Sequence, residues 1–105
     1  MAGTISWITS FVPAVENPNV EIYDGDGEIV QSVPVPCKPP MNCAVVMNNV
    51  PAGEYTGGLA VGNDRYYYVE GQSIIAKAND LDHASTIEIT EMDQEVNINI
   101  YVNLL

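Results

Sequence analysis

The stretch that decides the fold runs from residue 19 to residue 55. It begins NVEIYDGDGEIVQSVPVP (19–36) and continues, after a short insert, as CAVVMNNVPAGEY (43–55). In the first part, apolar and polar residues alternate on both sides of Asp24-Gly25-Asp26-Gly27, and Asp-Gly pairs in this setting predict a β-hairpin. In the second part, a strand leads into VPAGEY (50–55), which predicts a corner before the next strand. This order is typical of a small antiparallel β-sandwich.

The rest of the chain also consists of short extended segments. In the last one, VNINIYVNL (96–104), alternation places the valines, isoleucines and Leu104 on one side. Four prolines within residues 34–42 exclude a central strand there. No segment has a sustained 3.6-residue period, so we expect one all-β domain of eight or nine strands. The other expected elements are strands over 4–12, 54–61, 66–70, 73–78 and 86–90, and a polar loop or single helical turn at 79–84.

With these strands placed, the chain resembles the transthyretin-like or carboxypeptidase-regulatory-like branch of immunoglobulin-type sandwiches. The residues that carry the resemblance are 20–30 (VEIYDGDGEIV), 49–55 (NVPAGEY) and 96–102. The resemblance implies a small antiparallel Ig-like (prealbumin-like) β-sandwich over residues 19–105, with residues 1–18 as an N-terminal strand or arm. Families of this shape serve as adhesion, scaffold or accessory modules and share no single chemistry.

The charge of the chain is strongly one-sided. Fourteen Asp and Glu residues stand against three Lys and Arg residues, which gives a formal net charge of -11. Such a surface repels phosphate backbones and anionic lipids, so we expect neither nucleic acid nor membrane as a partner. The first twenty residues lack a basic start and a continuous apolar run, and we expect synthesis in the cytoplasm without a signal peptide.

The two cysteines form the first candidate site. Cys37 and Cys43 flank KPPMN, and a disulfide between them would close a small ring that stabilises the fold by about 2 kcal/mol. Two free thiols are the alternative, because cytoplasmic synthesis disfavours disulfides. A zinc site would need two further ligands, and the sole histidine, His83, lies far away in the sequence. We therefore expect no zinc.

Catalysis and metal binding are not expected. A nucleophile-and-base pair would have to use His83, and a sandwich of this size offers little cleft. Oxygen ligands for calcium could come from the DGDGE turn (24–28), or from Asp80 and Asp82, but the spacing is not that of an EF-hand loop. A type I′ turn, in which glycine supplies a positive φ, explains the DGDGE turn better. We expect no catalytic residue, cofactor or metal.

Aromatic residues supply the candidate contact sites. Tyr66, Tyr67 and Tyr68 are consecutive, so in a strand Tyr67 faces away from the other two, and exposed tyrosines suit recognition of proteins or sugars. Core packing explains the three tyrosines equally well. An assembly interface is expected at Trp7 and Phe11, in the N-terminal arm, together with the C-terminal Leu104 and Leu105. The arm either folds back as an extra strand or pairs with a neighbouring subunit.

Two functional hypotheses follow. The first is a non-enzymatic structural subunit of a large assembly, such as a viral or phage capsid decoration protein on the virion surface. Its partners would be copies of itself and a shell protein. The alternative is an adhesion module that binds a carbohydrate or a receptor, with several tyrosines on one exposed patch and Asn97, Asn99 or Asn103 as hydrogen-bonding groups.

Overall fold

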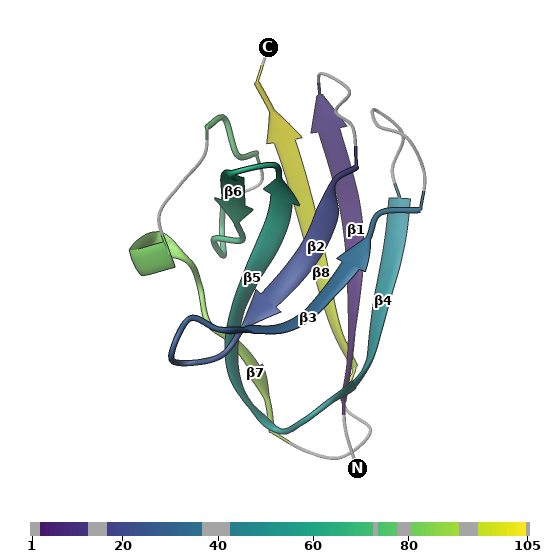
Figure 1. The fold of residues 1–105 in the computed structure, drawn as a ribbon, viewed down its shortest axis with the longest axis vertical. Helices are drawn as coiled ribbons and strands as arrows, with labels where there is room; N and C mark the ends of the chain where they lie inside the picture. Colours follow the sequence, from purple (N-terminus) through teal and green to yellow (C-terminus); the bar gives the residue numbers. More distant parts are fainter. Residues whose placement is uncertain are drawn as a thin grey trace.

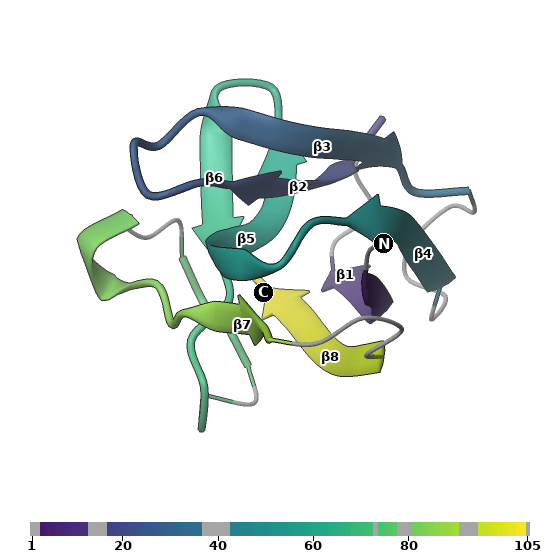
Figure 2. The same cartoon turned by 90° about the horizontal axis from the view of Figure 1, so that it is seen from below.

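The protein is a sandwich of two β-sheets (Figures 1 and 2). The computed structural model describes residues 3–12, 17–36, 43–72, 74–77, 81–90 and 95–104. The smaller sheet has the order β4 (Cys43–Val50), β1 (Gly3–Val12), β8 (Glu95–Asn103). The larger sheet has the order β3 (Ile29–Pro34), β2 (Asn19–Tyr23), β5 (Gly53–Val61), β6 (Asp64–Tyr67), and β7 (Ile87–Ile89) pairs with the beginning of β5. The predicted all-β sandwich is confirmed, whereas its Ig-like or prealbumin-like character stays a prediction.

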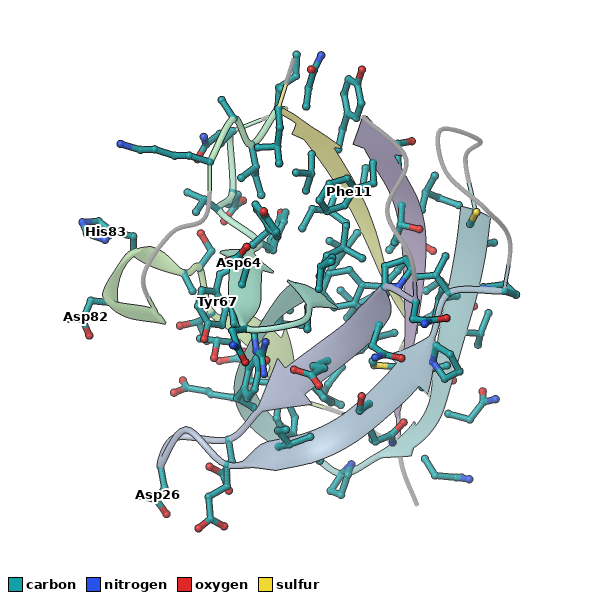
Figure 3. The ribbon with its side chains drawn as sticks, turned by 45° about the horizontal axis from the view of Figure 1, so that its top comes forward. Phe11, Asp26, Asp64, Tyr67, Asp82 and His83 are labelled. Atoms are coloured by element: carbon teal, nitrogen blue, oxygen red, sulfur yellow. The ribbon has the colours of Figure 1, made fainter. Side chains whose placement is uncertain are left out.

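The core lies between the two sheets and follows from the alternation along the strands. In β8, Ile98, Ile100 and Val102 are buried while Asn97 and Asn99 are exposed, as the sequence predicts. Trp7 and Phe11 of β1 also point inward and are almost fully buried. Figure 3 shows Phe11 between the two sheets. Burial of these apolar side chains is the main stabilising contribution to the fold.

The N-terminal segment forms β1, which is the central strand of the smaller sheet. It pairs antiparallel with β4, and it pairs parallel with β8 from Thr4 opposite Glu95 to Val12 opposite Asn103. Of the two alternatives for the arm, folding back within the same molecule is the one found. The division of the chain into residues 1–18 and a domain over 19–105 stays a prediction, although β1 lies inside the smaller sheet and joins β4 to β8.

The predicted hairpin is present between β2 and β3, with a different turn from the one expected. Asp24 O accepts a hydrogen bond from Gly27 N at 3.0 Å. Within residues 24–28, Gly27 is the one residue with a positive φ, of 81°. This is a type I turn followed by a left-handed glycine rather than a type I′ turn, which needs two positive φ angles. The Asp24 side chain stabilises the turn, because its Oδ1 accepts hydrogen bonds from Asp26 N and Glu28 N at 2.9 and 3.0 Å.

The corner between β4 and β5 is also as predicted. Tyr55 is buried, and its hydroxyl donates a hydrogen bond to the carbonyl of Pro51. Three further expectations are met only in part. The strand expected at 66–70 is found earlier, as β6 (Asp64–Tyr67). In place of a strand at 73–78, the described residues 74–77 contribute a single bridge between Ile75 and Val102, and a 3₁₀ turn, η1 (Leu81–His83), lies in the segment expected as a loop or helical turn. No helix in the described part of the chain is long and apolar enough to span a bilayer.

Candidate functional site

The outer face of the larger sheet carries a polar cluster formed by Glu21, Tyr23, Ser32, Arg65 and Tyr67. Glu21 and Tyr23 occupy alternate positions of β2, so their side chains share the face opposite to the buried Val20 and Ile22. Strand pairing places Ser32 opposite Glu21 and brings Arg65 and Tyr67 of β6 two strands away. Gly58 lies between Glu21 and Tyr67 and has no side chain, which lets these groups approach one another.

The Glu21 carboxylate is the centre of the polar cluster and is almost completely buried. Arg65 Nε lies 3.3 Å from its Oε1, the Tyr23 hydroxyl donates to the same oxygen, and Ser32 Oγ donates to Oε2 at 3.2 Å. These three groups satisfy the buried charge, which would otherwise be costly to bury. Burial, reinforced by the hydrogen bond to Glu21, raises the pKa of Tyr23 far above its usual range.

This arrangement stabilises the sheet and offers no reactive group. The carboxylate oxygens are engaged with a guanidinium and two hydroxyls of the same chain, so these contacts hold neighbouring strands of the sheet together. The Tyr23 and Tyr67 rings pack edge to face with centroids 5.6 Å apart, which further fixes the polar cluster. We interpret the polar cluster as a structural brace across β3, β2 and β6.

The outer face of the smaller sheet has the opposite character, because it carries almost no charge. Among all residues of β1, β4 and β8, only Glu95, the first residue of β8, is charged. We name the outward-facing residues of this sheet other than Glu95 the uncharged face. They are Thr4, Ser6, Ile8 and Ser10 of β1, Ala44, Val46 and Asn48 of β4, and Asn97, Asn99, Tyr101 and Asn103 of β8.

Exposed apolar side chains gather on this sheet. Ile8 and Val46 are 43% and 51% exposed, and they are diagonal neighbours because Val46 lies opposite Ser6. Ile74, 47% exposed, precedes the residue that bridges to Val102 and so lies at the β8 edge of the same sheet. Three of the five exposed large hydrophobic residues in the described part of the chain therefore belong to this sheet or its edge. An apolar centre with a polar rim is the usual composition of a protein interface.

The three consecutive tyrosines do not form one exposed patch. Tyr66 is buried, with its ring edge-on to Phe11 at 5.2 Å, and Tyr68 is partly buried against the core. Tyr67 belongs to the polar cluster on the larger sheet, while Tyr101 lies on the other side of the sandwich. These tyrosines therefore lie in separate places, and recognition of a partner by Tyr66, Tyr67 or Tyr68 stays a prediction.

The expected assembly interface is also not present as a group. Trp7 and Phe11 are 0% and 2% exposed in the core of their own chain, so they have no surface to offer a partner. The reason is that β1 is an internal strand whose inward positions face the larger sheet. Leu104 is 41% exposed, and Leu105 lies outside the described residues.

The remaining candidates are the cysteines and the acidic turns. Cys43 is disulfide-bonded, and Cys37 lies outside the described residues, so their mutual pairing stays a prediction. In the described part of the chain, no three His, Cys, Asp or Glu side chains are grouped as a metal site. Asp82 and His83 are exposed on η1 and project away from the sandwich in Figure 3, and Asp80 lies outside the described residues.

A small cavity lies beside Phe11, Cys43 and Leu59. The cavity there has a volume of about 10 Å³ and mainly apolar lining. That is room for roughly one water molecule and excludes an organic substrate.

No family model, curated protein or solved structure matches this chain. Its function therefore has to be inferred from its own residues. The uncharged face is the feature that the sequence interpretation missed, although segments 3–12, 43–50 and 96–103 contain no charged residue in a chain of net charge -11.

Proposed function

We propose that this chain is a non-enzymatic structural subunit of a large assembly, of the kind that decorates a viral or phage capsid on the virion surface. The observation that carries the proposal is the uncharged face, which interrupts the otherwise acidic surface over one whole side of the sandwich. A subunit that packs beside its neighbours needs such a face, because opposed carboxylates at a contact are destabilising.

The acidic remainder of the surface has a complementary role in this proposal. A net charge of -11 keeps the free subunit soluble and steers it towards a basic patch on a shell protein. Each contact is modest by itself, and many copies on one shell make attachment strong by multivalency.

The proposal is tested by gentle size fractionation of the source material, with the chain tracked by mass spectrometry. A structural subunit travels in megadalton particles at a fixed copy number relative to a shell protein. If the chain runs instead as an 11.4 kDa monomer or a small oligomer, with none in the particle fractions, the proposal fails.

A glycan- or receptor-binding module is the second candidate, and one observation favours it. Tyr101 lies on the uncharged face with Asn97, Asn99 and Asn103 on the same strand, and Asn103 Nδ2 donates to the Tyr101 hydroxyl at 3.3 Å. An aromatic ring beside amides is a common sugar-binding combination. A glycan array separates the two candidates, because a lectin-like module retains a sugar that its Tyr101→Ala variant does not.

A further inference from the structure

We infer that the uncharged face binds the same face of a second copy of this chain, sheet against sheet. The inference deepens the proposed function by naming the partner at that face, and it rests on that proposal. Two observations favour a second copy over an unrelated partner, the charge distribution and the chemistry of the polar side chains, and the size of the face sets how tightly two copies bind.

Charge limits where two copies can meet. Each copy carries a net charge of -11, so contacts through the larger sheet or the hairpin turn bring carboxylates such as Asp24, Asp26 and Glu28 towards one another. Like charges at an interface disfavour association. Among the residues that the structure describes, the uncharged face is the side where two copies approach with only Glu95, at one end of β8, as a charge within the sheet.

The polar side chains of the uncharged face can pair with themselves. Serine hydroxyls and asparagine amides both donate and accept hydrogen bonds. The uncharged face can therefore form hydrogen bonds with the same face of a second copy, without a charged group on either side. The exposed amides of Asn48, Asn97 and Asn99 lie around Ile8 and Val46. A basic partner would place its ammonium or guanidinium groups against neutral side chains, and it would bind better on the acidic larger sheet.

The size of the face predicts weak association. Three strands spaced by about 4.8 Å and eight residues of about 3.4 Å each give a footprint of roughly 400 Å² per copy. Two such footprints fall below the usual size of a stable protein–protein interface. A pair of free chains should therefore dissociate in the micromolar to millimolar range, and a crowded shell would hold the same contact by multivalency.

Sedimentation equilibrium of the full chain, from micromolar to millimolar concentration, tests the inference. The weight-average mass should rise above 11.4 kDa towards twice that value. The Ile8→Glu and Val46→Glu variants should weaken the association about tenfold or more, because each places a carboxylate in the apolar centre. The matched control is Ile29→Glu, since Ile29 is 54% exposed but belongs to β3 on the other sheet, and it should associate like the parent chain.

Circular dichroism checks that each variant is folded, and concentration-dependent NMR shifts of the parent chain locate its contact surface independently. A chain that stays monomeric at millimolar concentration overturns the inference. A dimer whose concentration-dependent NMR shifts lie outside β1, β4 and β8 also overturns the inference. The same holds for a dimer whose dissociation constant is unaffected by Ile8→Glu and Val46→Glu. Recovery of the chain in particles despite any of these results leaves the proposed function standing, whereas absence from particles removes the proposed function itself.

Discussion

At the scale of single residues, contacts between strands that are distant in the sequence determine which polar side chains are buried. Glu21 belongs to an alternating strand, and the sequence places it correctly on the polar side. Its burial follows from Ser32, Arg65 and Tyr23, which come from three strands and surround the carboxylate. Local sequence does not contain this information, because β6 reaches β2 only across β5.

Gly57 provides a test of close packing between the sheets. A Cβ at this position would lie 2.6 Å from the Glu21 carbonyl oxygen and 3.3 Å from the Trp7 ring. Gly57→Ala should lower the free energy of unfolding by about 1–3 kcal/mol, because backbone and a buried ring cannot both move away. Gly25→Ala is the control, since nothing lies within 4 Å of its Cβ, and it should stay within about 0.5 kcal/mol of the parent. Equal urea midpoints for the two variants would contradict this packing.

The buried tyrosines predict loss of stability at alkaline pH. Burial raises the pKa values of Tyr23, Tyr55 and Tyr66, with the Glu21 hydrogen bond adding to the effect at Tyr23. Below pH about 10, both the folded and the unfolded chain keep these phenols protonated. As the pH rises further, the unfolded chain loses these protons first, so the free energy of unfolding falls.

Near-ultraviolet absorbance of tyrosinate during a pH titration follows the ionisation of these tyrosines, and the free energy of unfolding at each pH gives the alkaline slope of stability. Tyr23→Phe should remove one late-titrating group and reduce the alkaline slope of stability, while keeping the ring contact with Tyr67. An unchanged slope in Tyr23→Phe would show that Tyr23 ionises at its ordinary pKa in the folded chain.

At the scale of elements, the sequence identifies strands better than it identifies their neighbours. The β2–β3 hairpin and the alternation of β8 are local patterns, and both are confirmed. The pairing of β1 with β8 joins the two ends of the described chain, so no local pattern could assign it. The turn type was missed for a simpler reason: DGDG contains two glycines, and the sequence does not say which one takes the positive φ.

The central position of β1 has a direct consequence for truncation. Removal of residues 1–12 deletes Trp7 and Phe11 from the core and leaves β4 and β8 without the strand that joins them. We expect the truncated chain to be unfolded, with collapsed amide dispersion in its NMR spectrum. If the truncated chain kept native amide dispersion, residues 1–12 would be a separable arm and the sandwich would fold without β1.

At the scale of the whole molecule, the charge is unevenly placed. Of the described acidic residues, most lie in turns and on the larger sheet, whereas Glu95 is the one charged residue of the smaller sheet. Charge counting leads to the expectation that nucleic acid is not a partner, which stays a prediction. It could not locate the uncharged face, because that face depends on the arrangement of β4, β1 and β8.

This placement predicts that salt strengthens association between copies. The contact itself contains almost no charge, while each copy carries -11 overall, so added salt mainly screens repulsion. The dissociation constant from sedimentation should fall as sodium chloride rises from low to physiological concentration and beyond. Weaker association at higher salt would point to a charge-paired contact elsewhere on the surface.

The most direct test of the account is incorporation of variants into the native assembly. Val46→Lys and Ile29→Lys add the same charge at side chains that are 51% and 54% exposed, on opposite sheets of the sandwich. Each would be mixed with the parent chain during assembly, and its fraction in purified particles measured by mass spectrometry. We predict that Ile29→Lys is incorporated like the parent and that Val46→Lys is depleted. Equal incorporation of both variants would contradict the claim that the uncharged face joins this subunit to its neighbours.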